Sequence, residues 1–273
     1  MDKMGWTVSA KLMRHWFDSP AWSMSDHERE GKDANGNSLD YVSLKRDFPH
    51  RVVDDVVKMD WLLGYEHVAS ALSRLALEWS SPNGKIQLRK RLKSAGWQPE
   101  MNFFQLGSPN MSAIELDNSC QVNRRPVGST TNTFNDYFGA IFMATLKIAV
   151  IGHTSYNSTT KKNKFHVSKA GFYLRDTYDF NVGSGLVDKF LGLGVWSKDR
   201  LLTKGETIYY LDGNLNGIGK MRNRAMFPGF VQVWNENFKE WSKKHGRGGD
   251  FFVFSDVKWE TPSSLIPIEI PLE

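Results

Sequence analysis

Residues 164–181, KFHVSKAGFYLRDTYDFN, join a strand pattern to a dense group of polar side chains. Phe172 and Leu174 fall on one face of an extended strand, while Tyr173 and Arg175 fall on the other. The stretch continues with two aspartates, a tyrosine and an asparagine, and a glycine-rich loop follows. Because rigid elements often present functional groups on adjacent loops, this stretch predicts both a sheet and a candidate site.

The two aspartates have an alternative, purely structural interpretation. Side chains of this type often accept backbone amides in turns at the end of a strand. On an extended strand Asp176 and Tyr178 face one way and Asp179 faces the other. Their carboxylates therefore converge only if the chain bends at Thr177 or Tyr178. The glycines at 182–185 permit such a bend but do not require it.

The composition is that of an ordinary folded protein. With 273 residues, 40% hydrophobic and 24% charged, the chain is long enough for one large domain or two modest ones. A net charge of +5 favours anionic partners without selecting one. The single cysteine, Cys120, excludes an internal disulfide and a multi-cysteine zinc site, and it predicts a reducing compartment.

No export or membrane signal is recognisable in the sequence. The first residues lack the apolar segment and the cleavage pattern of a secretory leader. The most apolar run, 137–152, is interrupted by Lys147 and is too short to span a bilayer. We therefore expect a soluble protein without a transmembrane segment.

Helical periodicity dominates the stretch after Asp54. Apolar residues recur every three or four positions and predict one long helix; they are Trp61, Tyr65, Val68, Leu72, Leu75 and Trp79. A second helix is expected over 85–95, with basic residues around Arg89 and a stop at Gly96. Those charges are interpreted as a solvated face, and an anionic partner is the alternative.

The second half of the chain predicts strands. Residues 137–150 alternate and return through a polar turn into the 164–181 strand, so the two are expected to pair antiparallel. We predict an α+β fold, with a helical N-terminal half packed on a mostly antiparallel, twisted C-terminal sheet. A closed barrel is the alternative form of that sheet.

Three regions are expected along the chain. They are an irregular arm at 1–50 broken by Pro20, a helical region with loops at 51–135, and a β-rich domain with inserted helices at 136–273. In the alternative division, the second and third regions form one continuous domain.

Five separated stretches carry a family likeness. They are MRHWFDSPAWSM at 13–24, VVKMDWLLGYEHV at 56–68, GFYLRDTYDFN at 171–181, LGVWSKDRLLTK at 193–204 and WSKKHGRGGDFFVFSDV at 241–257. Together they resemble a bacterial family without an assigned activity whose genes often lie beside type VI secretion genes. The resemblance runs over almost the whole chain. It implies a bacterial protein of interbacterial competition, delivered as an antibacterial effector.

A shorter resemblance concerns Asp176-x-Tyr178-Asp179 alone. It is similar to the Asp-x-Tyr-Asp element of colicin M-like bacteriocins, toxins that cut the lipid II pyrophosphate link in the periplasm with a divalent metal. In that family a His-Arg pair follows the second aspartate within a few residues. Here residues 182–186 read VGSGL, so the pair is missing, and the nearest downstream arginine is Arg200.

The implied chemistry is cleavage of a phosphate ester or pyrophosphate. Such cleavage needs cations to neutralise developing charge and a base to prepare water. Asp176 and Asp179 are the candidate ligands for Mg²⁺, with Tyr178 beside them. Arg175 or Arg200 is a candidate clamp for phosphate oxygens. His153, expected in a turn after a strand, is a candidate acid or base; His166 is the alternative, although its alternating place along a strand is more typical of a structural residue.

Our first functional hypothesis is a type VI secretion-associated antibacterial effector that hydrolyses lipid II or another phosphate-containing envelope precursor. The alternative is a non-enzymatic adaptor or structural component of the secretion apparatus that binds a protein partner. An immunity protein is disfavoured, because such proteins are commonly smaller and acidic.

The hypothesis also sets the expected partners and location. The partners are a secretion-apparatus component or a cognate immunity protein, together with an anionic lipid-linked substrate, and we expect no nucleic acid ligand. The protein is expected in the cytoplasm of the producing cell and, after type VI delivery, in the periplasm of a target cell.

Overall fold

The computed structural model describes residues 1–129, 132–180, 193–214, 217–261 and 268–270. The chain forms two compact units, each assembled from separate stretches. The first unit comprises Met1–Met24, Ser129–Phe142 and Tyr178–Phe251, and the second comprises Ser25–Gly128, Met143–Thr177 and Phe252–Glu273. The glycine-rich segment 182–185, expected to follow the candidate site, lies outside the described residues.

A mixed sheet of eight strands forms the centre of the second unit. The spatial order across the sheet is β1-β8-β5-β4-β2. In addition, β3 pairs with β4, and both β9 and β10 pair with β5. Their bounds are β1 (Val52–Val57), β2 (Phe103–Leu106), β3 (Gln121–Val127), β4 (Ala144–Asn157), β5 (Lys162–Tyr178), β8 (Phe251–Ser255), β9 (Lys258–Glu260) and β10 (Ile268–Glu269). Strands β1 and β8 are parallel, whereas β4 pairs antiparallel with β2, β3 and β5. The predicted α+β class is confirmed, and the sheet is open rather than closed into a barrel.

Strands β4 and β5 form the predicted antiparallel pair. Both faces of their inner halves are buried, so Tyr173 and Lys147, which lie opposite each other, are as enclosed as the aliphatic residues beside them. The pairing contains one irregularity: Ile151 lies opposite Lys169, while the next residue, Gly152, lies opposite Val167. One extra residue of β5 is therefore accommodated in a β-bulge.

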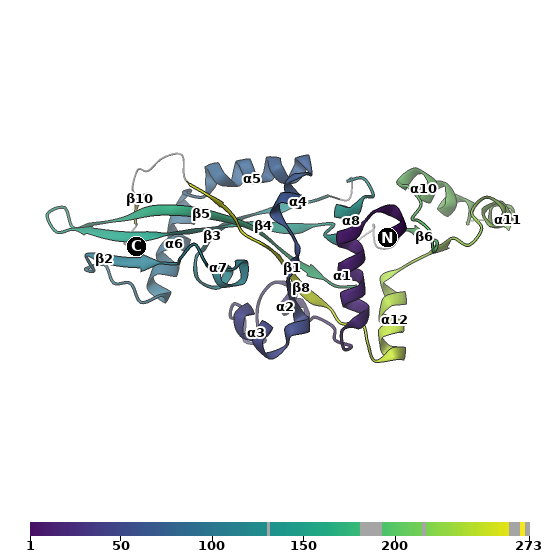
Figure 1. Cartoon of the computed structure of the whole chain (residues 1–273), viewed down its shortest axis with the longest axis horizontal. Helices are drawn as coiled ribbons and strands as arrows, with labels where there is room; N and C mark the ends of the chain where they lie inside the picture. Colours follow the sequence, from purple (N-terminus) through teal and green to yellow (C-terminus); the bar gives the residue numbers. More distant parts are fainter. Residues whose placement is uncertain (130–131, 181–192, 215–216, 262–267, 271–273) are drawn as a thin grey trace. The chain divides into compact units, whose positions relative to one another are not determined.

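Helices cover both sides of these strands. They are α2 (Asp26–Arg29), α3 (Tyr41–Asp47), α4 (Met59–Leu63), α5 (Glu66–Glu78), α6 (Pro82–Ser94) and α7 (Ala113–Ser119), with a 3₁₀ turn, η2, at Pro49–Arg51. Figure 1 shows α5 on one side of β4 and β5, and α3 and α7 on the other. The buried residues Val68, Leu72 and Leu75 hold α5 in place, as their helical spacing predicts.

The single long helix predicted after Asp54 is wrong. The chain first completes β1 at Val57 and then forms the short α4, which ends at Gly64 before α5 begins. The next helix starts earlier than expected, because Ser81 caps it and Pro82 occupies its first position. Its expected stop is confirmed: Gly96 has a φ of +100°, a conformation that favours glycine.

The first unit is largely helical. It contains η1 (Asp2–Met4), α1 (Thr7–Asp18), α8 (Asp136–Ala140), α10 (Lys204–Gly213), α11 (Gly217–Met226) and α12 (Asn235–His245), with a strand pair β6 (Val195–Trp196) and β7 (Val231–Gln232). Thr203 and Glu206 form a capping box at the start of α10. Helix α11 begins at Gly217, and α12 begins at Asn235, where Trp234 occupies the cap position.

Residues 1–50 are not an irregular arm, because α1 fills 7–18. Pro20 follows the helix instead of interrupting it, and Val8, Leu12 and Trp16 recur every four residues on a buried face. The start of α1 is held by Asp136 of α8, whose carboxylate accepts the Val8 amide at 3.1 Å and the Ser9 amide at 2.8 Å. A negative charge at this end also suits the helix dipole.

An aromatic cluster forms the core of the first unit around Trp16. Edge-to-face contacts join its ring to Phe180 at 4.9 Å and to Phe238 at 5.4 Å, and Phe180 stacks on Phe238 at 3.8 Å. The indole nitrogen of Trp16 donates to Asp250 at 3.1 Å. Among the described residues, no helix has both the length and the apolar character needed to cross a bilayer.

Candidate functional site

The bend on which the predicted hydrolase site depends is not present before Tyr178. Strand β5 stays extended from Lys162 to Tyr178, so Asp176 and Tyr178 share one face of it. Asp176 is buried and belongs to the second unit, whereas Asp179 follows the strand and belongs to the first. Because both faces of β5 are packed, the strand stays extended through residues that locally favour a turn.

Tyr178 and Arg200 have structural surroundings in the first unit. The Tyr178 ring stacks on Phe251 with centroids 5.0 Å apart, and its hydroxyl lies 3.8 Å from the sulfur of Met13. Both terminal nitrogens of Arg200 donate to Glu206, each at 2.8 Å. The guanidinium that was predicted to clamp a phosphate is thus already held by a carboxylate in a two-pronged pair.

His153 lies in the middle of a strand and not in a turn. It stands opposite His166, and the two rings stack with centroids 4.8 Å apart. Asp176 lies ten positions after His166 in β5, which corresponds to roughly 30 Å along an extended strand. His153 therefore cannot serve the same reacting group as Asp176.

The described residues contain no group of three or more His, Cys, Asp or Glu side chains placed to hold a metal ion. Binding of Mg²⁺ by Asp176 and Asp179 stays a prediction. Cys120, which follows α7, is buried, and burial raises the pKa of its thiol, which disfavours the reactive thiolate.

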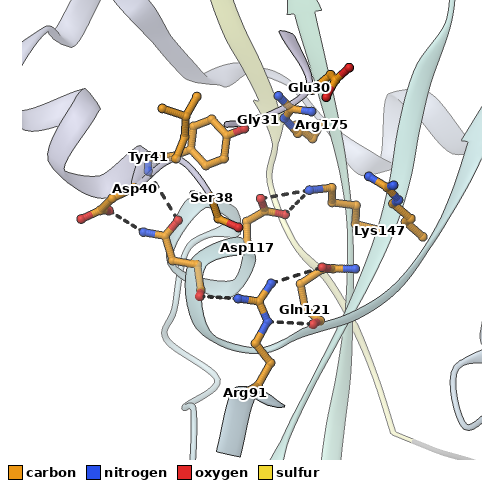
Figure 2. Close-up of a pocket in the computed structure, with 13 residues that line it drawn as sticks. Glu30, Gly31, Ser38, Asp40, Tyr41, Arg91, Asp117, Gln121, Lys147 and Arg175 are labelled. Atoms are coloured by element: carbon orange, nitrogen blue, oxygen red, sulfur yellow. Dashed lines mark hydrogen bonds and ion pairs between the residues drawn. The ribbon is translucent and has the colours of Figure 1, made fainter. Parts of the chain in front are cut away.

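A different set of residues lines a cavity of about 400 Å³ in the second unit. Its walls come from α3, α6, α7, the strands β3, β4 and β5, and the segment that joins α2 to α3. Figure 2 shows Lys147 of β4 and Asp117 of α7 pointing at each other, with Arg91 approaching from one side and Tyr41 and Arg175 on another. The lining is predominantly polar and carries four cationic side chains: Arg91, Arg124, Lys147 and Arg175.

Lys147 and Asp117 form a buried ion pair at this cavity. The Lys147 amine donates to the two carboxylate oxygens of Asp117 at 2.7 and 3.0 Å, and the buried Tyr173 hydroxyl donates to one of the same oxygens at 2.7 Å. Burial lowers the pKa of Lys147 to about 8 against the opposing effect of Asp117, and the nearby Arg175 and Arg124 lower it further. Burial, and then the Asp117 charge, raise the pKa of Tyr173 well above its ordinary value.

Arg175 is fixed within the cavity wall. Its side chain is 8% exposed, donates to the Arg29 carbonyl at 3.1 Å and lies 5.4 Å from the ring centres of both Tyr41 and Phe252. Among the described residues its Nε has no hydrogen-bond partner. Gly31 makes this packing possible: its φ is +80°, and a Cβ there would lie 2.8 Å from the Tyr41 hydroxyl.

The other two arginines also lack a carboxylate partner. Arg91 donates to the carbonyls of Asn118 at 2.8 Å and Gln121 at 3.1 Å, and to the Gln121 side chain at 3.3 Å. Arg124 is exposed at the cavity, and the described part of the chain holds no ion pair to it. Three guanidinium charges thus meet one cavity without a neutralising carboxylate.

The acidic residues of the lining are already engaged. Asp117 neutralises Lys147, and Glu30 pairs with Lys32 at 2.7 Å. Asp40 caps α3 and accepts the side-chain amide of Asn118 at 2.5 Å. The charge available to a ligand is therefore positive, and it comes from arginines whose planar groups suit phosphate or carboxylate oxygens.

Of these residues, the sequence predicts only Arg175 as a ligand for phosphate oxygens, and Arg175 does line the cavity. Lys147 is recognisable in the sequence only as an interruption of an apolar run. The available signal was a lysine inside a stretch of alternating strand residues, which is costly to bury unless a carboxylate from another element meets it. Asp117 lies 30 residues earlier, so local patterns do not identify it.

Comparisons with known proteins give the chain a family. No curated protein and no solved structure matches it. A family described as "Family of unknown function (DUF6402)" matches residues 1–270. The match spans both compact units and the whole cavity lining, so the chain belongs to this family of unknown function, DUF6402.

Proposed function

We propose that the protein binds a small phosphate-bearing ligand in the cavity between α7 and strands β3, β4 and β5. The observation that supports the proposal is the set of three arginines, Arg91, Arg124 and Arg175, that face the cavity without a carboxylate partner in the described residues. A phosphate group would supply the missing negative charge and accept several N–H donors at once.

The burial of Arg175 strengthens this proposal. An exposed arginine is readily solvated, but Arg175 is almost fully buried and keeps an unpaired Nε. A buried polar group without a partner destabilises a fold by about 1–3 kcal/mol, so the arrangement is costly unless a ligand completes it. The aromatic rings beside the guanidinium also hold it in one orientation before any ligand binds.

The cavity restricts the kind of ligand. About 400 Å³ lies near the lower end of the range for small-molecule sites. Its polar lining suits a hydrophilic molecule, such as a sugar phosphate or the pyrophosphate head group of a larger compound, more than a lipid chain.

Calorimetric titration with inorganic phosphate, pyrophosphate and a neutral sugar tests the binding proposal. Pyrophosphate should bind most tightly and the neutral sugar should not bind. Replacing Arg175 or Arg124 with glutamine should weaken pyrophosphate binding about ten-fold or more, since a hydrogen bond to a charged group contributes about 1.5–3 kcal/mol.

The matched control is Arg74→Gln. Arg74 is an exposed arginine of α5 in the same unit, and it does not line the cavity. Like Arg175→Gln, this substitution removes one positive charge from the chain. A loss of affinity in Arg175→Gln alone therefore reports a contact in the cavity and not the general attraction of an anion to a basic protein. Equal affinity for the wild type, Arg175→Gln and Arg74→Gln would contradict the proposal.

We further propose that this ligand binding belongs to an antibacterial effector of a type VI secretion system that acts on a phosphate-containing envelope precursor. The support is the resemblance of five ordered stretches and the phosphate chemistry of the cavity. The alternative, an adaptor of the secretion apparatus, would use its basic surfaces for a protein partner and would not depend on the cavity.

Expression in a bacterial host separates the two. The wild type, Arg175→Gln and Asp179→Ala chains are each produced in the cytoplasm or directed to the periplasm, and growth is followed. Periplasm-only growth arrest that Arg175→Gln removes supports the effector. Arrest removed only by Asp179→Ala would return the activity to the β5 terminus, and harmless expression in both compartments would contradict the effector proposal.

A further inference from the structure

One lysine at the proposed phosphate site has the surroundings of a reactive amine. The amine of Lys147 lines the cavity beside Arg124 and Arg175, and its only carboxylate partner in the described residues is Asp117. Asp117 is in turn bonded to the Tyr173 hydroxyl, which is fully buried behind it. We propose that Lys147 condenses with the carbonyl group of a phosphorylated aldehyde or ketone to form an imine.

The inference rests on the proposed function and names its ligand class more closely. Arg124 and Arg175 would each contribute in two ways. They would bind the phosphate of the ligand, and by their positive charge they already favour the neutral form of the neighbouring amine. A lysine desolvated beside another cation is a recognised way to obtain a nucleophilic amine near neutral pH.

The step balances without any oxidant or reductant. The neutral Lys147 nitrogen attacks the carbonyl carbon, a C–N bond forms, and the carbonyl oxygen takes up a proton. Loss of that oxygen as water then leaves a C=N bond, so one amine and one carbonyl give one imine and one water. Asp117 is placed to accept the proton that leaves Lys147, since it already contacts the amine at 2.7 Å.

Tyr173 acts as a positioning residue. Its hydroxyl donates to the Oδ1 atom of Asp117 that also accepts from Lys147, so it fixes the carboxylate while the amine changes protonation. Tyr173 does not line the cavity, and therefore it is not expected to touch the ligand. Tyr173→Phe should slow imine formation several-fold and leave phosphate affinity unchanged.

Trapping with a phosphorylated aldehyde tests the inference on the full chain. The protein is incubated with pyridoxal 5′-phosphate and sodium cyanoborohydride, digested, and analysed by mass spectrometry. Lys147 should be modified at least ten-fold faster than Lys90, an exposed lysine of α6. Its modification rate should rise with pH through about 8, whereas the rate at exposed lysines should keep rising toward their ordinary pKa of 10.5.

Two controls make the result specific. Pyridoxal without the phosphate should label Lys147 at least ten-fold more slowly, and excess inorganic phosphate should protect Lys147 from the phosphorylated aldehyde. Lys147→Arg keeps a cation beside Asp117, so it should fold, bind phosphate and lose the label. Unchanged circular dichroism of this variant checks the fold.

The outcomes separate this inference from the proposed function. Selective labelling of Lys147 that phosphate blocks supports both. If calorimetry shows phosphate binding but Lys147 is labelled no faster than Lys90, the imine proposal is overturned. The Lys147–Asp117 pair is then a structural ion pair within a phosphate site. Fast labelling by pyridoxal and its phosphate alike, without protection, supports the reactive amine and overturns the phosphate site. If phosphate does not bind and Lys147 is not selectively labelled, both proposals are overturned.

Discussion

Tyr173 and Asp117 are joined by a 2.7 Å hydrogen bond in which a fully buried phenol donates to a carboxylate from a helix 56 residues earlier in the chain. The bond ties β5 to α7, and the pair with Lys147 ties β4 to the same carboxylate. One side chain thus links two neighbouring strands to the helix that covers them. Its partners should be energetically coupled.

We expect the Lys147–Asp117 pair to be strongly non-additive. Lys147→Met leaves the Asp117 charge buried without its cation, and Asp117→Asn leaves the ammonium without its anion. Each single change should lower the free energy of unfolding by about 3–5 kcal/mol, because an uncompensated buried charge is unfavourable. The double variant should lose less than the sum of the two, as urea unfolding monitored by fluorescence can show.

Tyr173→Phe is the milder control for this cycle. It removes one hydrogen bond and retains both charges, so the expected loss is about 1 kcal/mol. If the losses of Lys147→Met and Asp117→Asn simply add up in the double variant, the ion pair does not hold α7 on the sheet.

Asp250 should give the first unit an unusual pH dependence. Burial raises the pKa of this carboxyl from 3.8 to about 6, although the Met24 amide and the Trp16 indole donate to it and the Asp179 charge adds to the rise. Because the folded state holds the proton more tightly than the unfolded state, the stabilisation is complete below pH 3.8 and is lost as the pH rises through about 6. The change amounts to at most about 3 kcal/mol.

The measurement is the difference in unfolding free energy between the wild type and Asp250→Asn as a function of pH. Asparagine does not titrate, so the other carboxyl groups cancel in the difference. The advantage of the wild type should shrink as the pH rises from 4 to 7. An advantage that grows with pH would mean that the hydrogen bonds outweigh burial and hold the pKa of Asp250 low.

Gly152→Ala should destabilise the β4–β5 pair. A Cβ at this position would collide with the backbone carbonyl of His166 across the bulge. Backbone atoms in a paired strand move little, so we expect a loss of about 1–3 kcal/mol in the free energy of unfolding. Gly205→Ala in α10 is the matched control. Apart from the adjoining residues and the backbone of the helix itself, no atom lies within 4 Å of the new methyl, and alanine favours a helix, so its effect should be neutral or slightly stabilising.

Asp136→Ala should weaken the start of α1. The aspartate accepts the amides of Val8 and Ser9 and the Ser9 hydroxyl, so its loss leaves buried donors without partners. The expected cost is about 2 kcal/mol, the upper end for a helix cap. Hydrogen exchange should report it as faster exchange at the Val8 and Ser9 amides, and unchanged protection there would contradict the capping role.

The sheet could be predicted from the sequence because strand alternation is a local property. Leu146, Ile148 and Val150 occupy one face of β4 as their spacing requires. The helix stop at Gly96 could be predicted for the same reason, since it depends on residues within one turn.

The cavity site could not be predicted from the sequence, because it depends on which elements cover each face of the sheet. In a half-buried sheet Lys147 would point to water, but α7 lies over it and supplies Asp117. The Asp176 segment shows the opposite error: Asp176, Thr177 and Tyr178 stay in the extended strand although they are typical of a turn, and Tyr178 packs against Phe251. Both outcomes are decided by tertiary packing, which a local window does not contain.

The bulge at Ser168 also determines which residues the outer part of the β4–β5 pair can show to its surroundings. Odd-numbered residues of β5 such as Tyr173 stand across from the Lys147 side of β4, but beyond the bulge the even-numbered His166 takes that position beside His153. If the same sequence paired without the bulge, Gly152 would lie opposite Ser168, and Val167 would replace His166 opposite His153. By accommodating one extra residue, the bulge therefore decides which side chains of β5 accompany His153 in the outer part of the hairpin.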